Sequence, residues 1–314
     1  MIIRSTLLSV LVFCFASAIG CGGGQEAVQA ESKPTGHPCF EQNNMQACLV
    51  LGKRTLDKTR PDYGKARRLL SRACLVRDAE ACALFGGLLQ NGLGGPIDLQ
   101  RASDALSVGC EGGQESACLN LASLHNNPLN ERKDPEQAKV LLQRLCSSDP
   151  PSSRACEQLG DMYNDPNAPS DGHEALGHHN TACELGQKSA CVAAATLTVR
   201  ASTTSAADKQ AAAKRLEGLC EEDIELGCFE LASLHQEGDI PGGSAAQAAL
   251  LYRAVCDHEP PRGCYEAGRL YERGLIQARS FEATALYTRA CEHGHDIACE
   301  RRSMLAALQE ATQQ

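Results

Sequence analysis

Small and large apolar residues recur at fixed places along the chain, at intervals of 34–38 residues. A small residue is followed two positions later by a large apolar one, as in Gly86 and Leu88, and such a pair returns six more times. A small side chain at a fixed helical position lets a neighbouring helix approach closely. The pattern therefore predicts stacked helical repeats. A further set in the same register consists of alanines: Ala66, Ala102, Ala138, Ala175, Ala212, Ala248 and Ala283.

Capping residues predict two helices in each repeat. The first helix is expected to begin near a cysteine such as Cys82 and to end at a glycine such as Gly92. The second helix is expected to begin at a capping residue such as Asp98 or Asp134, the latter followed by Pro135. No stretch has a convincing alternating pattern of a strand, so the predicted fold class is all-α.

Sixteen cysteines follow the same period. The first cysteine of each pair is placed at the end of a second helix, and the other lies in the first turn of the next helix. We therefore expect nearest-neighbour disulfides that staple consecutive repeats, each stabilising by about 2.6 kcal/mol for a loop of about nine residues. Metal binding is the alternative, but the chain contains no C-x-x-C motif. The expected pairs are Cys39–Cys48, Cys74–Cys82, Cys110–Cys118, Cys146–Cys156, Cys183–Cys191, Cys220–Cys228, Cys256–Cys264 and Cys291–Cys299.

Composition narrows the class of protein. Aromatic residues make up 4% of the 314 residues and Trp is absent, so the core must be built mostly from Ala and Leu. Eighteen cysteines are too many for a reducing cytosol without a metal or redox role. The net charge of −9 offers no reason to expect a nucleic-acid partner. The sequence predicts no cofactor and no metal site.

The N-terminus predicts export. Residues 1–20 have one charge, Arg4, followed by an apolar run too short to span a bilayer, which is typical of a signal peptide. The run from Ala18 to Cys21 is similar to a bacterial lipobox, in which cleavage leaves an acylated cysteine; ordinary cleavage after Ala18 is the alternative. Loss of Cys14 and acylation of Cys21 would leave an even number of cysteines, which favours the lipoprotein interpretation.

Three segments follow from this interpretation. Residues 1–20 are the signal peptide, residues 21–38 are the acylated cysteine and a flexible tether, and residues 39–314 are the repeat solenoid. We expect an exported protein of the periplasm or cell surface, in contact with the membrane through its lipid anchor alone. Because Gly22 rather than Asp follows Cys21, the outer membrane is favoured.

Two segments carry a resemblance to a known family. Residues 81–92 (ACALFGGLLQNG) and 263–274 (GCYEAGRLYERG) resemble the Sel-one-like repeat, a relative of the tetratricopeptide repeat. With its paired cysteines, the chain is similar to the Helicobacter cysteine-rich protein subfamily. The resemblance implies a right-handed α-solenoid of about seven repeats with a C-terminal capping helix. The stretch from Cys191 to Ala213 departs most from the repeat pattern.

Two functions follow from the resemblance. The first is a non-enzymatic scaffold that binds a protein or peptide of unknown identity. The second is the penicillin-binding or weak β-lactamase activity described for the subfamily. No Ser-x-x-Lys, S-D-N or K-T-G element occurs, so no catalytic residue is predicted. The nearest approaches to a zinc site are His173 with His178 and His179, and His293 with His295, neither with a familiar spacing. A redox role is disfavoured by the regular structural pairing.

Resemblance to tetratricopeptide-type units also implies where a ligand would bind. Positions one, five and eight after the second cysteine of each pair would face the concave side. Side-chain amides both donate and accept hydrogen bonds, so a ladder of Asn and Gln could hold an extended backbone, with two aromatic residues as anchors. A solvated polar helix face is the alternative. The predicted groove consists of Gln90, Asn126, Asn164, Gln236 and Glu272 at position eight, and of Phe229, Tyr265, Ser123, Asp161, Ser233 and Arg269 at the others.

Overall fold

The computed structural model describes residues 37–165, 172–275 and 280–312. Every regular element in these ranges is a helix, which confirms the all-α prediction. The expected signal peptide, Cys21 and all of the expected tether except its last two residues lie outside the described residues. Of those two, Pro38 opens α1 (Pro38–Glu41), and His37 caps this helix by accepting a hydrogen bond at Nδ1 from the amide of Cys39.

Seven helix pairs follow α1, and α16 (Asp296–Thr312) closes the array, as the resemblance implied. The first helices of the pairs are α2 (Met45–Leu56), α4 (Ala79–Gln90), α6 (Glu115–Asn126), α8 (Ser153–Tyr163), α10 (Lys188–Arg200), α12 (Glu225–Glu237) and α14 (Pro260–Glu272). The second helices are α3 (Tyr63–Cys74), α5 (Leu99–Glu111), α7 (Pro135–Cys146), α9 (His173–Glu184), α11 (Ala206–Glu221), α13 (Ala245–His258) and α15 (Ser280–Glu292).

Local chemistry sets these helix ends. The side chain of Asp98 accepts a hydrogen bond from the amide of Arg101, and Asp134 caps α7 in the same way with Pro135 in its first turn. Gly92 follows α4 with a φ of +64°, in the left-handed region that favours glycine. The expected helix boundaries at these positions are confirmed.

Each small residue of the repeat packs against one large residue of the second helix. A Cβ added to Gly86 would lie 2.6 Å from Leu106, and one added to Gly160 would lie 2.8 Å from the ring of His179. The large residue stands four positions before the first cysteine of each pair and is buried in all seven repeats. The seven residues are Leu70, Leu106, Leu142, His179, Leu216, Tyr252 and Tyr287.

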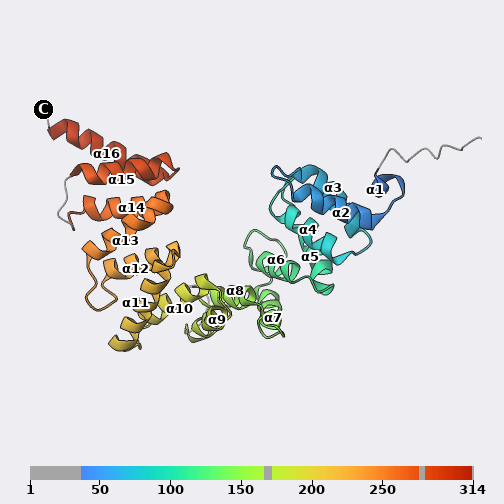
Figure 1. Ribbon diagram of the computed structural model, residues 1–314, viewed down its shortest axis with the longest axis horizontal. Coiled ribbons are helices and arrows are strands. Elements are labelled where there is room, and N and C mark those ends of the chain that lie inside the picture. Colours follow the sequence, from blue (N-terminus) through green and yellow to red (C-terminus); the bar gives the residue numbers. More distant parts are fainter. Residues whose placement is uncertain (1–36, 166–171, 276–279, 313–314) are drawn as a thin grey trace, which may run out of the picture.

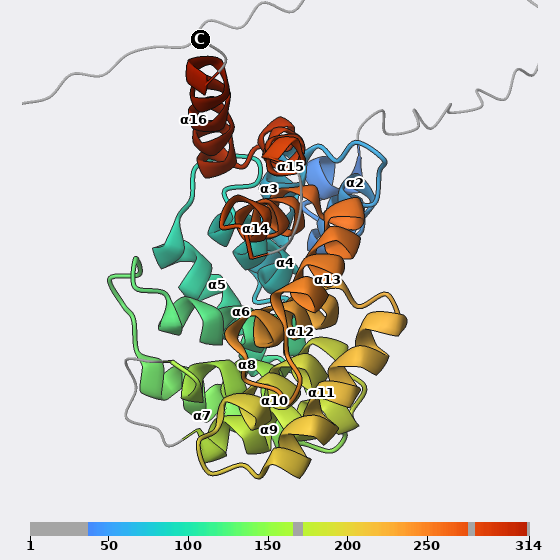
Figure 2. The same ribbon diagram turned by 90° about the vertical axis from the view of Figure 1, so that its left-hand side faces the viewer.

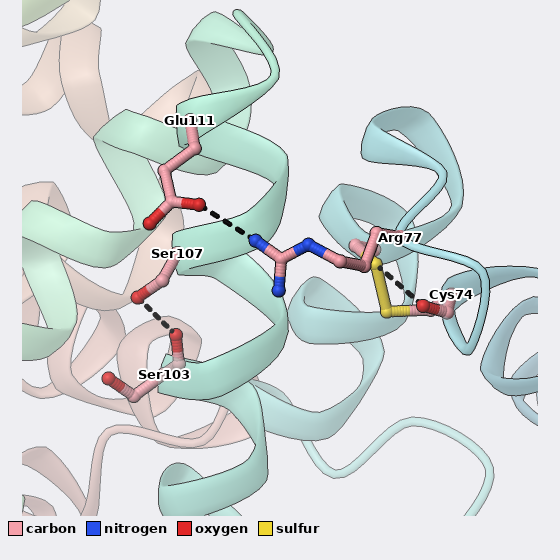
Figure 3. A network of polar contacts seen from close by, with 6 residues as sticks. Cys74, Arg77, Ser103, Ser107 and Glu111 are labelled. Carbon is pink, nitrogen blue, oxygen red and sulfur yellow. Dashed lines mark hydrogen bonds and ion pairs between the residues drawn. A yellow bond between two sulfur atoms is a disulfide. The ribbon is translucent and has the colours of Figure 1, made fainter.

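Consecutive repeats are joined covalently and by ion pairs. All eight disulfides have the expected nearest-neighbour pairing. Beside the disulfide of Cys74, a guanidinium nitrogen of Arg77 lies 2.9 Å from a carboxylate oxygen of Glu111 in the next repeat (Figure 3). In the same view, Ser107 donates a hydrogen bond to the carbonyl of Ser103 within α5.

The helix pairs form an open arc. In Figure 1, α2–α5 stand at one end and α14–α16 at the other, and α8 lies on the inner side of the turn with α7 and α9 on its outer side. In Figure 2, both ends rise above α7–α11. The segment that departs most from the repeat pattern still forms the regular pair α10 and α11. Among the described residues, none of the helices combines the length and apolar character needed to cross a membrane.

Candidate functional site

The first helices of the repeats line the inner, concave side of the arc. Direct contacts join α4 to α6 and α10 to α12, although a second helix lies between them in the sequence. A curved stack brings its helices closest together on the inner side, so these contacts agree with the position of α8 in Figure 1.

A polar cavity of about 610 Å³ opens between α6 and α8. Ala122, Leu142 and Met162 supply its apolar lining, and all three are buried. The other lining residues are polar: Ser123, Asn126, Asn127, Gln158, Asp161, Asn164 and Asp165. The structure thus brings together Ser123, Asn126, Asp161 and Asn164 of the predicted groove.

Three polar side chains of this cavity are available to a ligand. Ser123, Asn126 and Asn164 are exposed, and within the described part of the chain their side chains have no hydrogen-bond partner. Amide and hydroxyl groups in this state can both donate and accept. The size of the cavity is within the range of ligand sites, although its opening is broad rather than enclosed.

Sequence reasoning missed three residues of this cavity. Gln158 stands two positions after Cys156, and Asn127 and Asp165 stand nine positions after their cysteines. These positions lie beside the predicted ones on the helix surface, because two neighbouring helices together define a wider face than one helix does. The polar side chains at positions two and nine, two amides and one carboxylate, were the available signal.

Other members of the predicted ladder are occupied differently. Gln90 and Gln236 are half-buried, and their amide oxygens are buried without a partner. Neither residue lines the cavity between α6 and α8. The ladder is therefore not uniform along the arc.

The predicted aromatic anchors contact their own protein. The ring of Phe229 packs edge-on against Tyr252 with 5.2 Å between centroids, and the guanidinium of Arg262 lies 4.3 Å from the Phe229 centroid. Tyr265 stacks on His295 with 4.2 Å between centroids. Both aromatic residues are half-buried by these contacts.

The charged and hydroxyl members from α12 and α14 are also paired. Arg269 donates to Glu266 over 2.8 Å, and Ser233 donates to Glu237 over 2.8 Å. Glu272 accepts a hydrogen bond of 2.6 Å from the hydroxyl of Tyr287 and lies 3.4 Å from Arg301.

Electrostatics distinguish the region behind the cavity. The Nε2 atom of His179 lies 3.6 Å from a carboxylate oxygen of Asp161, beyond hydrogen-bond length, and neither ring nitrogen has a partner. Burial lowers the pKa of His179, so the imidazole is neutral at pH 7. Desolvation, together with Glu157, raises the pKa of Asp161 against the opposing effect of His179.

The histidines considered for a zinc site have other contacts. His178 stacks on Tyr163 with 5.4 Å between centroids, and His295 caps α16 by accepting from the amide of Ala298. Over the described ranges, no group of three or more His, Cys, Asp or Glu side chains is placed to hold a metal ion.

Seven stacked helix pairs with a concave face built from their first helices define an α-solenoid. The Sel1 repeat family matches residues 46–75, 115–150, 153–187 and 261–295, which correspond to four of the seven helix pairs. These four segments are therefore similar to the Sel1 repeat. None of the curated proteins matches the chain.

Two solved structures are similar to this chain in fold. A protective antigen of uropathogenic Escherichia coli strains, described as displaying an SLR fold, has a TM-score of 0.65 and 17% identity over 85% of this chain. The match spans 58% of that antigen. A Sel1 repeat protein from Oxalobacter formigenes has a TM-score of 0.61 and 18% identity, covering 77% of this chain and 96% of its own.

Proposed function

We propose that the protein is a non-enzymatic scaffold that binds an extended segment of a partner protein across its concave face. The observation that carries this proposal is the cavity between α6 and α8, which unites Asn126 and Asn164 with free donors and acceptors. An extended backbone presents alternating N–H and C=O groups, and side-chain amides match both. The family's general role in protein interaction supports the same conclusion.

Site-specific photocrosslinking tests this proposal. A photoreactive residue placed at Asn126 or Asn164 should capture the partner in intact cells, and sequencing of the crosslinked peptide should give one segment for both positions. Gln100, an exposed amide residue on the second helix α5, is the matched control and should capture far less. Equal capture from Gln100 would contradict the concave-face assignment.

We further propose that this scaffold is tethered in the bacterial envelope by acylation of Cys21, the cysteine of the lipobox-like run. Eight disulfides fit an oxidising compartment outside the cytosol. The structure pairs every cysteine from Cys39 to Cys299, so Cys21 would have no partner left within the mature chain. Cys21→Ser should move the protein from the detergent phase to the soluble periplasmic or secreted fraction, and unchanged partitioning would reject the anchor.

A further inference from the structure

The described lining of the cavity between α6 and α8 is acidic. Asp161 and Asp165 line it, whereas no Lys or Arg does. Lys139 of α7 is directed elsewhere, since its ammonium lies 3.2 Å from Glu136 and 5.3 Å from the centroid of Tyr163.

Asp161 lacks a compensating charge of its own. Its side chain is 67% exposed, so its carboxylate can be reached from the cavity. Its nearest basic group is the imidazole of His179, which is 1% exposed, unpartnered at both nitrogens and neutral at pH 7. One helical turn away, Glu157 adds negative charge while accepting hydrogen bonds from Ser189 and Gln187. A cationic ligand would therefore meet an uncompensated carboxylate.

Carboxylates on the first helices of the C-terminal repeats differ from Asp161 in this respect. Arg200 lies 3.7 Å from Glu230 and 3.5 Å from Glu237, measured between nitrogen and oxygen atoms. Both glutamates of α14 are also matched with arginines: Glu266 with Arg269, and Glu272 with Arg301. Carboxylates on this face are thus frequently neutralised by an arginine of the same chain, whereas Asp161 in the cavity is not.

We propose that this cavity receives a Lys or Arg side chain of the bound segment. The cation lies against the carboxylate of Asp161, and the aliphatic part of the side chain packs on Leu142 and Met162. Asn126 and Asn164 hold the backbone on either side. This specificity for a basic side chain rests on the proposed function. It selects partners whose bound segment carries a Lys or Arg at one position.

Selection from a display library of random short peptides tests this specificity. Peptides enriched on the full-length wild-type protein should share a Lys or Arg, and its replacement by Gln in a synthetic copy should weaken binding about tenfold or more. Asp161→Asn should weaken the basic peptide equally and leave the Gln peptide unchanged. Added salt should weaken the basic peptide more than the Gln peptide.

Matched variants separate the two proposals. Asp104→Asn removes a carboxylate of nearly equal side-chain exposure, 66%, from the second helix α5 and should leave binding unchanged. If the Lys and Gln peptides bind equally to wild type while Asn126→Ala weakens both, the charge specificity is wrong and the peptide scaffold stands. If Asn126→Ala weakens neither, or no peptide is selected, the proposed binding site itself fails. Circular dichroism confirms that each variant is folded.

Discussion

The cavity region, α6–α9, and the C-terminal arm, α12–α16, share the same packing of helix pairs but differ in the polar contacts of their surfaces. In both, a glycine of the first helix packs against a buried ring of the second: Gly160 against His179, and Gly268 against Tyr287. In the arm, the hydroxyl of Tyr287 reaches Glu272, and arginines match the glutamates. In the cavity region, the histidine reaches no partner and the carboxylate of Asp161 faces open space.

This difference shows how a repeat protein can acquire a site without changing its fold. The packing position accepts Leu, Tyr or His because each fills the space left by a small residue. A side chain at this position that hydrogen-bonds to its polar neighbour, as Tyr287 does with Glu272, occupies a group that could otherwise bind a ligand. A side chain that does not, such as His179, leaves its polar neighbour available to a ligand.

Breaking equivalent disulfides has the largest expected effect and tests whether the two regions share one scaffold. Replacing Cys146 and Cys156 by Ala should lower the free energy of unfolding by about 2.6 kcal/mol, because the unfolded chain is no longer restricted by the short loop that this disulfide closes. Replacing Cys256 and Cys264 should cost a similar amount. Denaturant unfolding of the two variants measures both losses. A loss confined to one region would show that the disulfides serve different purposes.

His179→Leu should stabilise the cavity region by about 2 kcal/mol at pH 7. A buried imidazole without partners loses its hydrogen bonds to water, and Leu occupies the equivalent place in four other repeats. The Gly52–Leu70 and Gly86–Leu106 contacts show that the space admits Leu. Tyr287→Leu is the control in the arm and should destabilise, because Glu272 loses its donor. A destabilised His179→Leu protein would contradict the unpaired-histidine interpretation.

Acid should weaken the cavity region more than the arm. A histidine whose pKa is lowered on folding binds fewer protons folded than unfolded, so its contribution is present above pH 6.5 and is lost as pH falls through that value. The free energy of unfolding should therefore fall between pH 7 and pH 5. In the described part of the arm, burial lowers the pKa of one histidine, His235, whereas in the cavity region it lowers those of His178 and His179. Burial raises the pKa of Tyr252 to about 12, and that of Tyr287 is also raised, so neither tyrosine titrates here.

The comparison with His179→Leu isolates this acid effect. His178 and His235 also have a pKa lowered by burial and contribute to the total loss of stability. The part due to His179 is the amount by which the gap in unfolding free energy between wild type and His179→Leu widens from pH 7 to pH 5. A constant gap would mean that His179 keeps its ordinary pKa in the folded protein.

The repeat architecture was predictable from the sequence because its signal is repeated. A small residue before a large apolar one, capping Asp residues and the cysteine pairs each recur in register. A single exception does not hide the period: in the first repeat, Arg54 stands two positions after Gly52, where the later repeats have Leu or Met. The pairing of all eight disulfides was also predictable, because the two cysteines of a pair flank one tight reversal between helices. The partner of each small residue was not predicted, since Leu, Tyr and His share volume rather than chemistry.

The site was predictable only in part. A single helix places positions one, five and eight on one face, and this suffices to find Asn126 and Asn164. Gln158 entered the cavity from a position that the single-helix pattern omits. Contacts between repeats decide which side chains stay free: Phe229 is covered by Arg262, which comes from the next first helix. Such pairing depends on distances that the periodic pattern does not contain.

The smallest expected effect comes from Arg301→Gln, which removes the arm's charge neutralisation at Glu272. The pair is 3.4 Å long and its arginine side chain is 44% exposed, so stability should fall by less than about 1 kcal/mol. Freed of its cation, Glu272 should give the arm a weak attraction for the basic peptide, which is best measured in an Asp161→Asn background where the cavity no longer responds. Arg77→Gln, which breaks the more exposed pair between the turn after α3 and Glu111 of α5, is the control and should create no such attraction. If Arg301→Gln instead lowers stability by more than about 2 kcal/mol, the arginine holds the arm together, and the contrast between a neutralised arm and an open carboxylate cavity would need another explanation.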